Sequence, residues 1–504
     1  MKRVIALLII ISMMITVLVS CGVDSDNNKT QTTTASNETT VDSNALTVDI
    51  EPMDESLAAL DYGGDRVVTI LARADKEEER FNRELWVEEL VGDPVADSIY
   101  NRNLYVCEEL GLKDIVQVEA EGITELQQKV TIMVDSGDQT YDIVAASVYY
   151  GSSMITQGLV YNLYDNDIDT YLDTTKPWWS QYWIEQAEMG EKLYCITGAP
   201  ALTLTRLMFV MYYNKDLGEE LQVEDMYTVV DEGRWTIDYL NKIVSDIYND
   251  NNGNDIKDEG DRFGIAINHY ENCDMFWSSF DMGLLSKDED NWFEFSSRDK
   301  EKIANAFEKV FYLIHENPGS FDSGTSEGFD IARDMFAGGD VLFAPLHLEY
   351  AESKEFRNMQ DEYGIIPIPK YDEKQKEYYT YAHDQYTVFT IPKTVESPEM
   401  SGAVLEVMAY DSYRTLQPTY YDVVLKGRYA NDPQSRKMLD MITTNFKLDP
   451  AWIYGQPLSL PAATVFRSLI YDGKKSFATS FAKIEKTVPF AIKAIKSIIS
   501  KIEY

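Results

Sequence analysis

An acidic loop at residues 250–261, DNNGNDIKDEGD, has the spacing of a metal-binding loop. Oxygen-bearing side chains stand at its first, third, fifth, ninth and twelfth positions, and a backbone carbonyl is available at the seventh. These positions are Asp250, Asn252, Asn254, Asp258, Asp261 and, for the carbonyl, Ile256. An all-oxygen set in this order is typical of EF-hand-like loops that bind Ca²⁺.

Two positions of this loop depart from the EF-hand pattern. Asp255 stands sixth, where glycine is usual, and Asp261 stands twelfth, where a bidentate glutamate is usual. Gly253 and the short last carboxylate are closer to dockerin-type calcium loops. The alternative is a bare acidic surface turn, because Asp, Asn and Gly are also turn formers. We expect such a loop to hold a structural Ca²⁺ that fixes local structure, and we expect no catalytic cofactor.

Catalytic motifs are missing from the sequence. It contains no HExxH, GxSxG, GxxxxGK[ST] or CxxC. The four histidines are scattered, and His347 and His383 suit hydrogen bonding to a ligand better than acid–base chemistry. With 85 acidic residues, a carboxylate pair for glycan hydrolysis is neither supported nor excluded. The sequence therefore favours a protein that is not an enzyme, with a glycan hydrolase or lyase as the alternative.

Aromatic residues indicate the chemistry of a ligand. The chain has 33 Tyr and 8 Trp, which crowd in KPWWSQYW (176–183), SVYYGS and PTYYDVV. Aromatic faces stack on sugar rings or on bases, and they also pack cores. The net charge of −40 argues against nucleic acid and against an anionic membrane surface, so sugars are favoured. The Trp-rich stretch could line a cleft or seal a lobe.

The N-terminus has the order of a lipoprotein signal. Lys2 and Arg3 precede an apolar run that is shorter than the roughly 20 residues of a membrane span, and LVSC ends at Cys21. This predicts a signal peptide at 1–20 and lipidation (palmitate) of Cys21, which leaves three cysteines and no complete disulfide framework. The alternative is a plain secreted protein or a membrane anchor. Residues 21–60 begin with a Thr-, Ser- and Asn-rich segment and predict a disordered tether.

Apolar strands alternate with helical patterns after this segment, which predicts parallel βαβ units and an α/β fold. Strands are expected in 65–75 and 141–151, and helices in 98–112 and in 234–250, capped by Thr236. Ligands bind beyond the carboxyl ends of such strands. This places Arg73 and Asp75, and then Ser147, Tyr149 and Tyr150, at the rim of one cleft.

The C-terminal segment 481–504 has apolar residues at helical spacing. They are Ile484, Val488, Ile492, Ile495 and Ile499, with lysines between them. We expect this helix to pack on a lobe; the alternative is a helix that lies on a membrane.

Ten segments in order resemble the extracellular solute-binding lipoproteins of bacterial ABC importers, in the group that includes maltose-binding proteins and in a clostridial-type subgroup. Besides the lipobox and tether, they include YDIVAAS, GLVYNLYD, KLYCITGA, MYYNKDL, RWTIDYL, MFAGGDVLFAPL, YGIIPIPKYDEKQ and QYTVFTIPK. The resemblance implies two lobes of a periplasmic-binding-protein-like fold, with hinge strands crossing between them near 198–214 and 378–393. The implied divisions are 61–200 for the first part of lobe I, 201–377 for lobe II, and 378–504 for the return hinge and C-terminal helices shared by both lobes.

The resemblance also implies a function and a site. The protein would be a monomer, held on the extracellular face of the cell membrane only by its lipid, that captures a sugar or oligosaccharide and delivers it to an ABC permease. The alternative without transport is a surface-sensing lipoprotein. The implied ligand contacts are Arg73, Asp75, Tyr149, Tyr150, Trp277, Ser278, His347, Tyr350 and Asp384. Trp277 is the strongest single candidate, although a core position suits it equally; Trp235 is expected in the core.

Overall fold

The computed structural model describes residues 50–74, 84–296, 299–325, 328–425, 433–458 and 462–502. The predicted signal peptide, Cys21 and Asp75 lie outside these residues. The chain divides into the segment Met1–Asn44 and a compact unit, Ala45–Tyr504, and only the second is described below.

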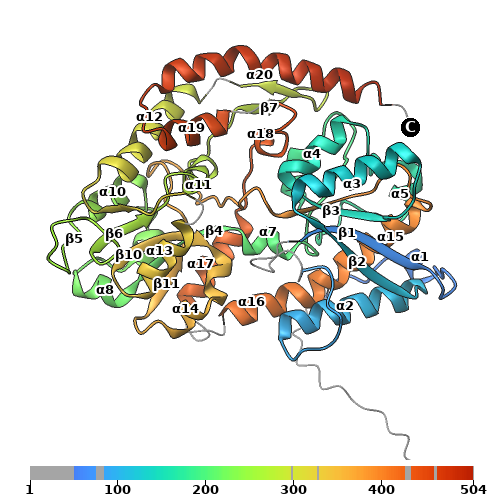
Figure 1. The fold of residues 1–504 in the computed structure, drawn as a ribbon, viewed down its shortest axis with the longest axis horizontal. Helices are drawn as coiled ribbons and strands as arrows, with labels where there is room; N and C mark the ends of the chain where they lie inside the picture. The colour runs from blue at the N-terminus through green and yellow to red at the C-terminus, as the bar shows by residue number, and fades with distance from the viewer. Residues whose placement is uncertain are drawn as a thin grey trace, which may run out of the picture. The chain divides into compact units, whose positions relative to one another are not determined.

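A four-stranded sheet forms the first lobe, in the order β12-β3-β1-β2 (Figure 1). Its strands are β1 (Val67–Ala74), β2 (Asp114–Glu121), β3 (Ile143–Ser147) and β12 (Thr387–Thr390). The strand β1 pairs in parallel with β2 and β3, as the alternating pattern predicts, and β12 returns antiparallel to β3. The last strand therefore comes from the far end of the chain.

A second, mixed sheet forms the other lobe, in the order β11-β4-β10-β6-β5, with β9 beside β6. Its strands are β4 (Phe209–Asn214), β5 (Tyr248–Asn249), β6 (Arg262–Ile267), β9 (Ser320–Asp322), β10 (Val341–His347) and β11 (Tyr363–Ile366). The strands β10, β6 and β9 are parallel, whereas β4 runs antiparallel to both β10 and β11. The strands β7 (Leu285–Lys287) and β8 (Phe293–Phe295) form a separate hairpin.

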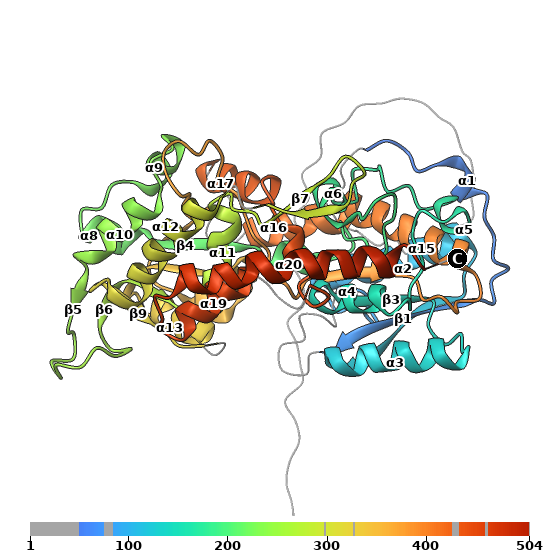
Figure 2. The same ribbon diagram turned by 90° about the horizontal axis from the view of Figure 1, so that it is seen from above.

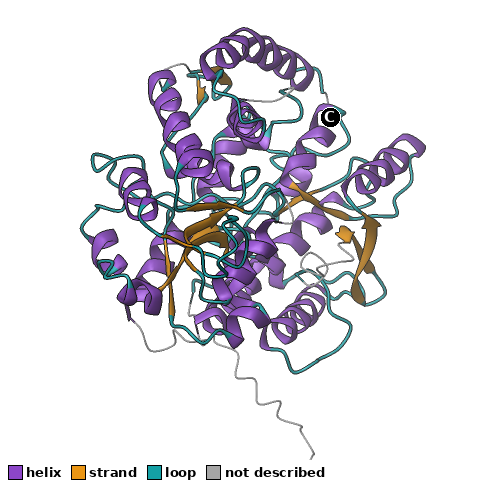
Figure 3. Cartoon of the chain, turned by 60° about the vertical axis from the view of Figure 1, so that its left-hand side comes forward, coloured by secondary structure: helices purple, strands orange, loops and turns teal. Residues whose placement is uncertain are grey.

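Helices surround both sheets (Figure 3). The predicted helix at 98–112 is α2 (Pro94–Leu110), which begins earlier because Asp93 caps it and Pro94 fits its first turn, and which ends at Gly111 with φ 59°. The other α-helices are α1 (Glu55–Ala58), α3 (Ile123–Ser136), α4 (Val148–Thr156), α5 (Asn166–Asp169), α6 (Gln181–Ala187), α7 (Leu202–Arg206), α8 (Lys215–Glu220), α9 (Met226–Asp231), α10 (Ile237–Ser245), α11 (Asn272–Ser279), α12 (Lys300–Phe311), α13 (Gly328–Ala337), α14 (Lys354–Asn358), α15 (Pro398–Asp411), α16 (Gln417–Leu425), α17 (Pro433–Thr444), α18 (Pro450–Ile453), α19 (Ala462–Tyr471) and α20 (Phe477–Ile499). Short π- or 3₁₀-helical turns are η1 (Tyr312–Glu316), η2 (Leu348–Glu352) and η3 (Ser412–Leu416).

Several local expectations are confirmed. Thr236 caps α10 by accepting a hydrogen bond from the Tyr239 amide, and Trp235 is fully buried. Cys107, Cys195 and Cys273 are free thiols. The tether, however, ends earlier than residue 60, because Leu57 in α1 is buried against the first lobe. Among the described helices, none is both long and apolar enough to cross a bilayer.

Two chain segments cross between the lobes, where the hinge was predicted. Met208 pairs with Ala382 beside the second sheet, and Thr387 pairs with Ser147 in the first sheet. Buried Glu84 joins the two crossings, because its carboxylate accepts from the Thr203 amide (2.8 Å) and from the Thr387 hydroxyl. The α/β two-lobe fold with crossing hinge strands is therefore as predicted.

The helix α20 contacts both lobes. It packs against α4 of the first lobe and against α12 and α19 of the second, and it lies across them in Figure 2. Its five predicted apolar positions are all buried, even though Pro489 lies inside the helix. The expectation that this segment packs on the protein is confirmed.

Candidate functional site

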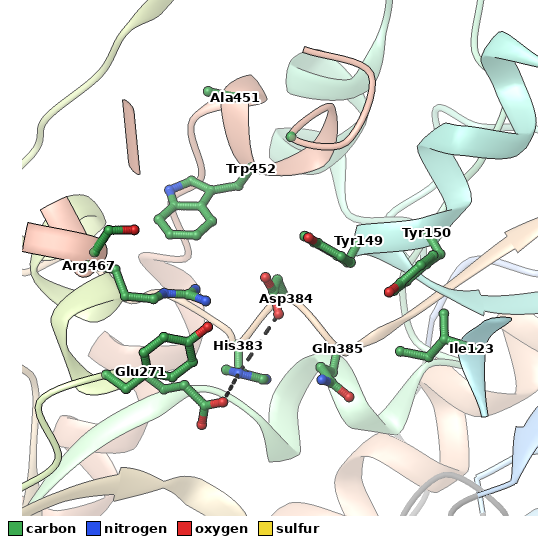
Figure 4. Close-up of a pocket in the computed structure, with 13 residues that line it drawn as sticks. Ile123, Tyr149, Tyr150, Glu271, His383, Asp384, Gln385, Ala451, Trp452 and Arg467 are labelled. Atoms are coloured by element: carbon green, nitrogen blue, oxygen red, sulfur yellow. Dashed lines mark ion pairs between the residues drawn. The ribbon is translucent and has the colours of Figure 1, made fainter. Parts of the chain in front are cut away.

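A cavity of about 400 Å³ lies where the two lobes and the crossing segment meet (Figure 4). The first lobe contributes residues from α3 and α4, and the second lobe contributes the loop after β6. The crossing segment, here residues 383–385, lies at the bottom of the cavity. Residues of α18 and α19 form the remaining wall. The lining residues are Ile123, Tyr149, Tyr150, Tyr270, Glu271, His383, Asp384, Gln385, Ala451, Trp452, Gly455, Arg467 and Ser468.

Tyr149 and Tyr150 form the aromatic wall on the first-lobe side. Their rings meet edge to face, with centroids 4.8 Å apart. The expected strand at 141–151 ends early, at Ser147, because the chain turns there into α4, so both tyrosines are helical. The Tyr149 amide donates to the Asp384 carbonyl (3.3 Å), which ties α4 to the crossing segment. Burial raises the pKa of Tyr149, so the phenol is a neutral hydrogen-bonding group.

His383 lies between two carboxylates at the bottom of the cavity. Its Nε2 is 3.9 Å from Glu271 Oε1 and 3.8 Å from Asp384 Oδ1. Asp384 is 8% exposed, and burial raises the pKa of its carboxyl, although nearby His383 opposes that shift. The structure therefore places the predicted residue Asp384 on the cavity.

Arg467 extends from α19 toward the cavity with its charge already paired. Its Nε donates to Asp274 Oδ1 (3.0 Å) and its Nη2 donates to Asp274 Oδ2. The guanidinium lies over the rings of Tyr270 and Trp452, 5.0 and 5.7 Å from their centroids. These contacts fix a flat, partly aromatic wall opposite Tyr149.

Arg73 lies behind the cavity rather than on it. Its Nη1 donates to Gln385 Oε1 (2.7 Å), and Gln385 lines the cavity. The structure thus gives Arg73 a supporting position at the end of β1.

Trp277 and Ser278 do not face the cavity, which corrects the expectation for both. All eight residues of α11 are buried, and Trp277 is 1% exposed. Its indole Nε1 donates to Asp449 (3.3 Å). The junction after β6 does reach the cavity, but through Tyr270 and Glu271, which precede the helix.

His347 and Tyr350 are also buried away from the cavity. His347 is the last residue of β10 and pairs with Phe209. Its ring packs on Phe209 and Phe329, with centroid distances of 4.5 and 4.7 Å. The His347 ring therefore packs inside the second lobe, behind His383, with ring centroids 5.3 Å apart.

Among the lining residues that sequence reasoning missed are Glu271, Trp452 and Arg467. Glu271 lies in the same junction after β6 for which Trp277 was predicted, so the sequence could have indicated it. Trp452 follows the helix-start signal Asp449-Pro450, which could have marked it. No signal in VFRSLI separates Arg467 from an ordinary surface arginine.

The Trp-rich stretch at 176–183 packs inside the first lobe, where its three tryptophans are buried. Trp178 and Trp179 donate their indole N–H groups to the carboxylate of Glu406 in α15 (3.0 and 2.8 Å). Trp183 donates to the Tyr386 hydroxyl (2.7 Å). Burial raises the pKa of Glu406 to about 8.

The acidic loop 250–261 lies in the second lobe, between α10 and β6. Asp250 accepts hydrogen bonds from the amides of Gly253, Asn254 and Asp255, and Asp258 accepts from the side chains of Asn252 and Asn254. Asp261 is buried and accepts from the Asn251 amide (3.2 Å). In the described part of the chain, no group of three or more His, Cys, Asp or Glu residues is arranged to hold a metal ion. The loop keeps its oxygen donors on one short segment, as a hard cation requires.

Comparison of the sequence with protein-family models and with curated proteins gives no match. Solved structures do match the fold. UspC of M. tuberculosis is 16% identical, with a TM-score of 0.53, and the match covers 84% of this chain and 100% of UspC. The GacH receptor of Streptomyces glaucescens, solved with acarbose, is 12% identical (TM-score 0.52; 87% and 100% covered). A cyclo/maltodextrin-binding protein complexed with maltotetraose is 13% identical (TM-score 0.51; 86% and 96% covered). These similarities show the two-lobe fold of maltose-binding-type proteins.

Proposed function

We propose that the protein is the solute-binding component of an ABC importer and that it captures a sugar or oligosaccharide in the cavity between its lobes. The observation that carries this proposal is the composition of the cavity wall. Aromatic rings stand on opposite sides, at Tyr149 and at Trp452, and hydrogen-bonding groups lie between them. Rings cover the C–H faces of a sugar and polar groups take its hydroxyls.

The similar folds support the same proposal. One is a receptor solved with acarbose and another is a binding protein complexed with maltotetraose. In a two-lobe protein, a ligand that contacts both lobes favours the closed arrangement. The closed protein would then deliver its ligand to the permease.

A thermal-shift screen of the full-length protein against mono- and oligosaccharides tests the proposal. A ligand that binds only the folded state raises the unfolding midpoint by mass action. We expect a concentration-dependent rise with one family of glycans. No rise with any glycan would contradict the proposal.

A glycan hydrolase is the second candidate, because Glu271 and Asp384 both face the cavity and hydrolysis uses paired carboxylates. The same screen separates the two functions if the glycans are recovered and analysed afterwards. A binding protein returns each glycan intact, whereas a hydrolase returns shortened products.

Three further features belong to the proposal. Lipid on Cys21 would hold the protein at the extracellular face of the cell membrane, and a short tether would raise its concentration near a permease. The order of LVSC after the apolar run supports this anchor. The loop 250–261 would hold one structural Ca²⁺, which its oxygen donors support.

A further inference from the structure

The two carboxylates in the cavity lack hydrogen-bond donors. Within the described part of the chain, neither the Glu271 nor the Asp384 side chain accepts a hydrogen bond, and His383 Nε2 lies 3.9 and 3.8 Å from their carboxylate oxygens. Asp384 is more than nine-tenths buried and points into the cavity (Figure 4). The oxygens of both carboxylates remain open to the cavity, so a ligand that supplies hydrogen-bond donors there replaces water around them.

The nearby cations are already engaged elsewhere. Arg467 is held by two contacts to the buried Asp274. Arg73 donates to Gln385 and shares a small pocket with Glu84. Arg73 acts on Asp384 only through space, where its charge opposes the rise that burial causes in the pKa of the Asp384 carboxyl. Among the described residues, two carboxylates therefore face this part of the cavity with His383 between them and with no arginine or lysine bonded to either.

A neutral sugar would not balance the charge of these carboxylates. A hydroxyl can donate a hydrogen bond to a carboxylate, but it brings no charge. A protonated amine brings both the donors and the charge, so it adds a Coulomb attraction to the carboxylate that a neutral hydroxyl lacks. The rings of Tyr149 and Tyr150 on the neighbouring wall add favourable surfaces for a cation.

We infer that the ligand of this site is an amino sugar, whose protonated amino group lies between Glu271 and Asp384. This inference rests on the proposed sugar-binding function and assigns its ligand class. Glu271 and Asp384 then select the charge of the ligand, while the aromatic walls select its ring.

The test is a calorimetric titration of the full-length protein, near neutral pH, with matched ligands. Glucosamine, galactosamine and mannosamine are each compared with the N-acetylated and the neutral parent sugar, as monosaccharides and as β-1,4- and α-1,4-linked disaccharides. We expect the best amino sugar to bind at least about tenfold more tightly than both of its counterparts, as a close charge pair provides. Equal or tighter binding of the neutral or acetylated sugar would overturn the inference and leave the proposed function standing.

Isosteric variants assign the effect to these residues. Asp384→Asn and Glu271→Gln should each remove most of the preference for the amine, measured as the ratio of the affinity for the amino sugar to the affinity for its neutral parent. Glu373→Gln, at an exposed acid away from the cavity, should keep the preference. An unchanged preference in both cavity variants would overturn the inference. If a variant does not fold, the affinities of the wild-type protein for the amino, neutral and acetylated sugars still test the inference.

A further set of probes separates the two proposals. Putrescine, choline and lysine carry the charge without the sugar ring. If no saccharide binds but one of these amines does, the sugar-binding function is wrong and the cationic preference stands. If neither set binds, both are wrong.

Discussion

Glu406 is the acceptor for two buried indoles, those of Trp178 and Trp179, and the pKa of its carboxyl is raised to about 8. The main cause is desolvation by burial, which disfavours the ionised form, and the indole N–H groups only partly offset it. In the unfolded chain this carboxyl would titrate near 4.5. Between these two values the folded protein holds a proton that the unfolded chain has released.

Stability should therefore fall as the pH rises through this window. The wild type is expected to lose up to about 1.4 kcal/mol of unfolding free energy per pH unit from this one group. Glu406→Gln removes the titration and keeps one acceptor oxygen, for one of the two indoles, so the variant should be less stable overall but its unfolding free energy should depend less on pH. Urea denaturation at a series of pH values measures the difference between the two proteins. Parallel pH profiles would contradict the account.

The candidate site shows what residue patterns can predict. Tyr149, Tyr150 and Asp384 were found because the end of a strand and the return hinge have recognisable sequences. Trp277 was misplaced because α11 carries polar residues, Asn272 and Asp274, as a ligand-facing helix would, although all of its residues are buried. Arg467 depends on Asp274, nearly two hundred residues away, and no local pattern contains that pairing.

At the scale of elements, α20 stabilises the molecule by burying one face against both lobes. Ile484→Ala should lower the unfolding free energy by about 2–5 kcal/mol, because it leaves a cavity under the helix. Phe490→Ala is the matched control, since Phe490 lies on the opposite face and is 74% exposed; it should change stability by no more than about 0.5 kcal/mol. Chemical denaturation measures both, and equal effects would contradict this packing.

A second prediction at this scale concerns Ca²⁺ in the loop 250–261. If it holds Ca²⁺, a chelator should lower the unfolding midpoint while the affinity for the glycan is kept, because the loop does not line the cavity. Asp250→Asn should reduce the effect of the chelator, and Glu259→Gln, at a non-ligand position of the same loop, should not. Elemental analysis of the purified protein supplies the check. If the purified protein contains no metal and the chelator leaves its unfolding midpoint unchanged, the calcium prediction is wrong and the loop is a bare acidic turn.

Alternation of apolar strands and helices was enough to predict an α/β fold and the parallel pairing of β1 in the first sheet, but strand direction in the second sheet was not predictable in this way. The antiparallel position of β4 depends on pairing with β10 and β11, which lie more than a hundred residues further on. Such pairings are set by the packing of the whole lobe rather than by local periodicity.

At the scale of the whole molecule, the proposed lipid anchor would determine where binding takes place. In cells fed a labelled fatty acid, the wild-type protein should incorporate label and fractionate with membranes, whereas Cys21→Ala should do neither. Cys107→Ala is the control, because Cys107 is a half-buried thiol in α2. Labelled Cys21→Ala protein would contradict the proposed lipidation.

The central claim is that the cavity between the lobes binds a saccharide, and one titration tests it most directly. The tightest-binding saccharide is titrated by calorimetry into the wild type, into Tyr149→Ala, and into Tyr471→Ala, a half-exposed tyrosine that does not line the cavity. The predicted result is saturable binding that weakens by about fivefold or more in Tyr149→Ala, since a lost ring contact is worth on the order of 1 kcal/mol or more. Binding to Tyr471→Ala should be unchanged. Binding that survives Tyr149→Ala intact, or no binding of any saccharide, would contradict the claim.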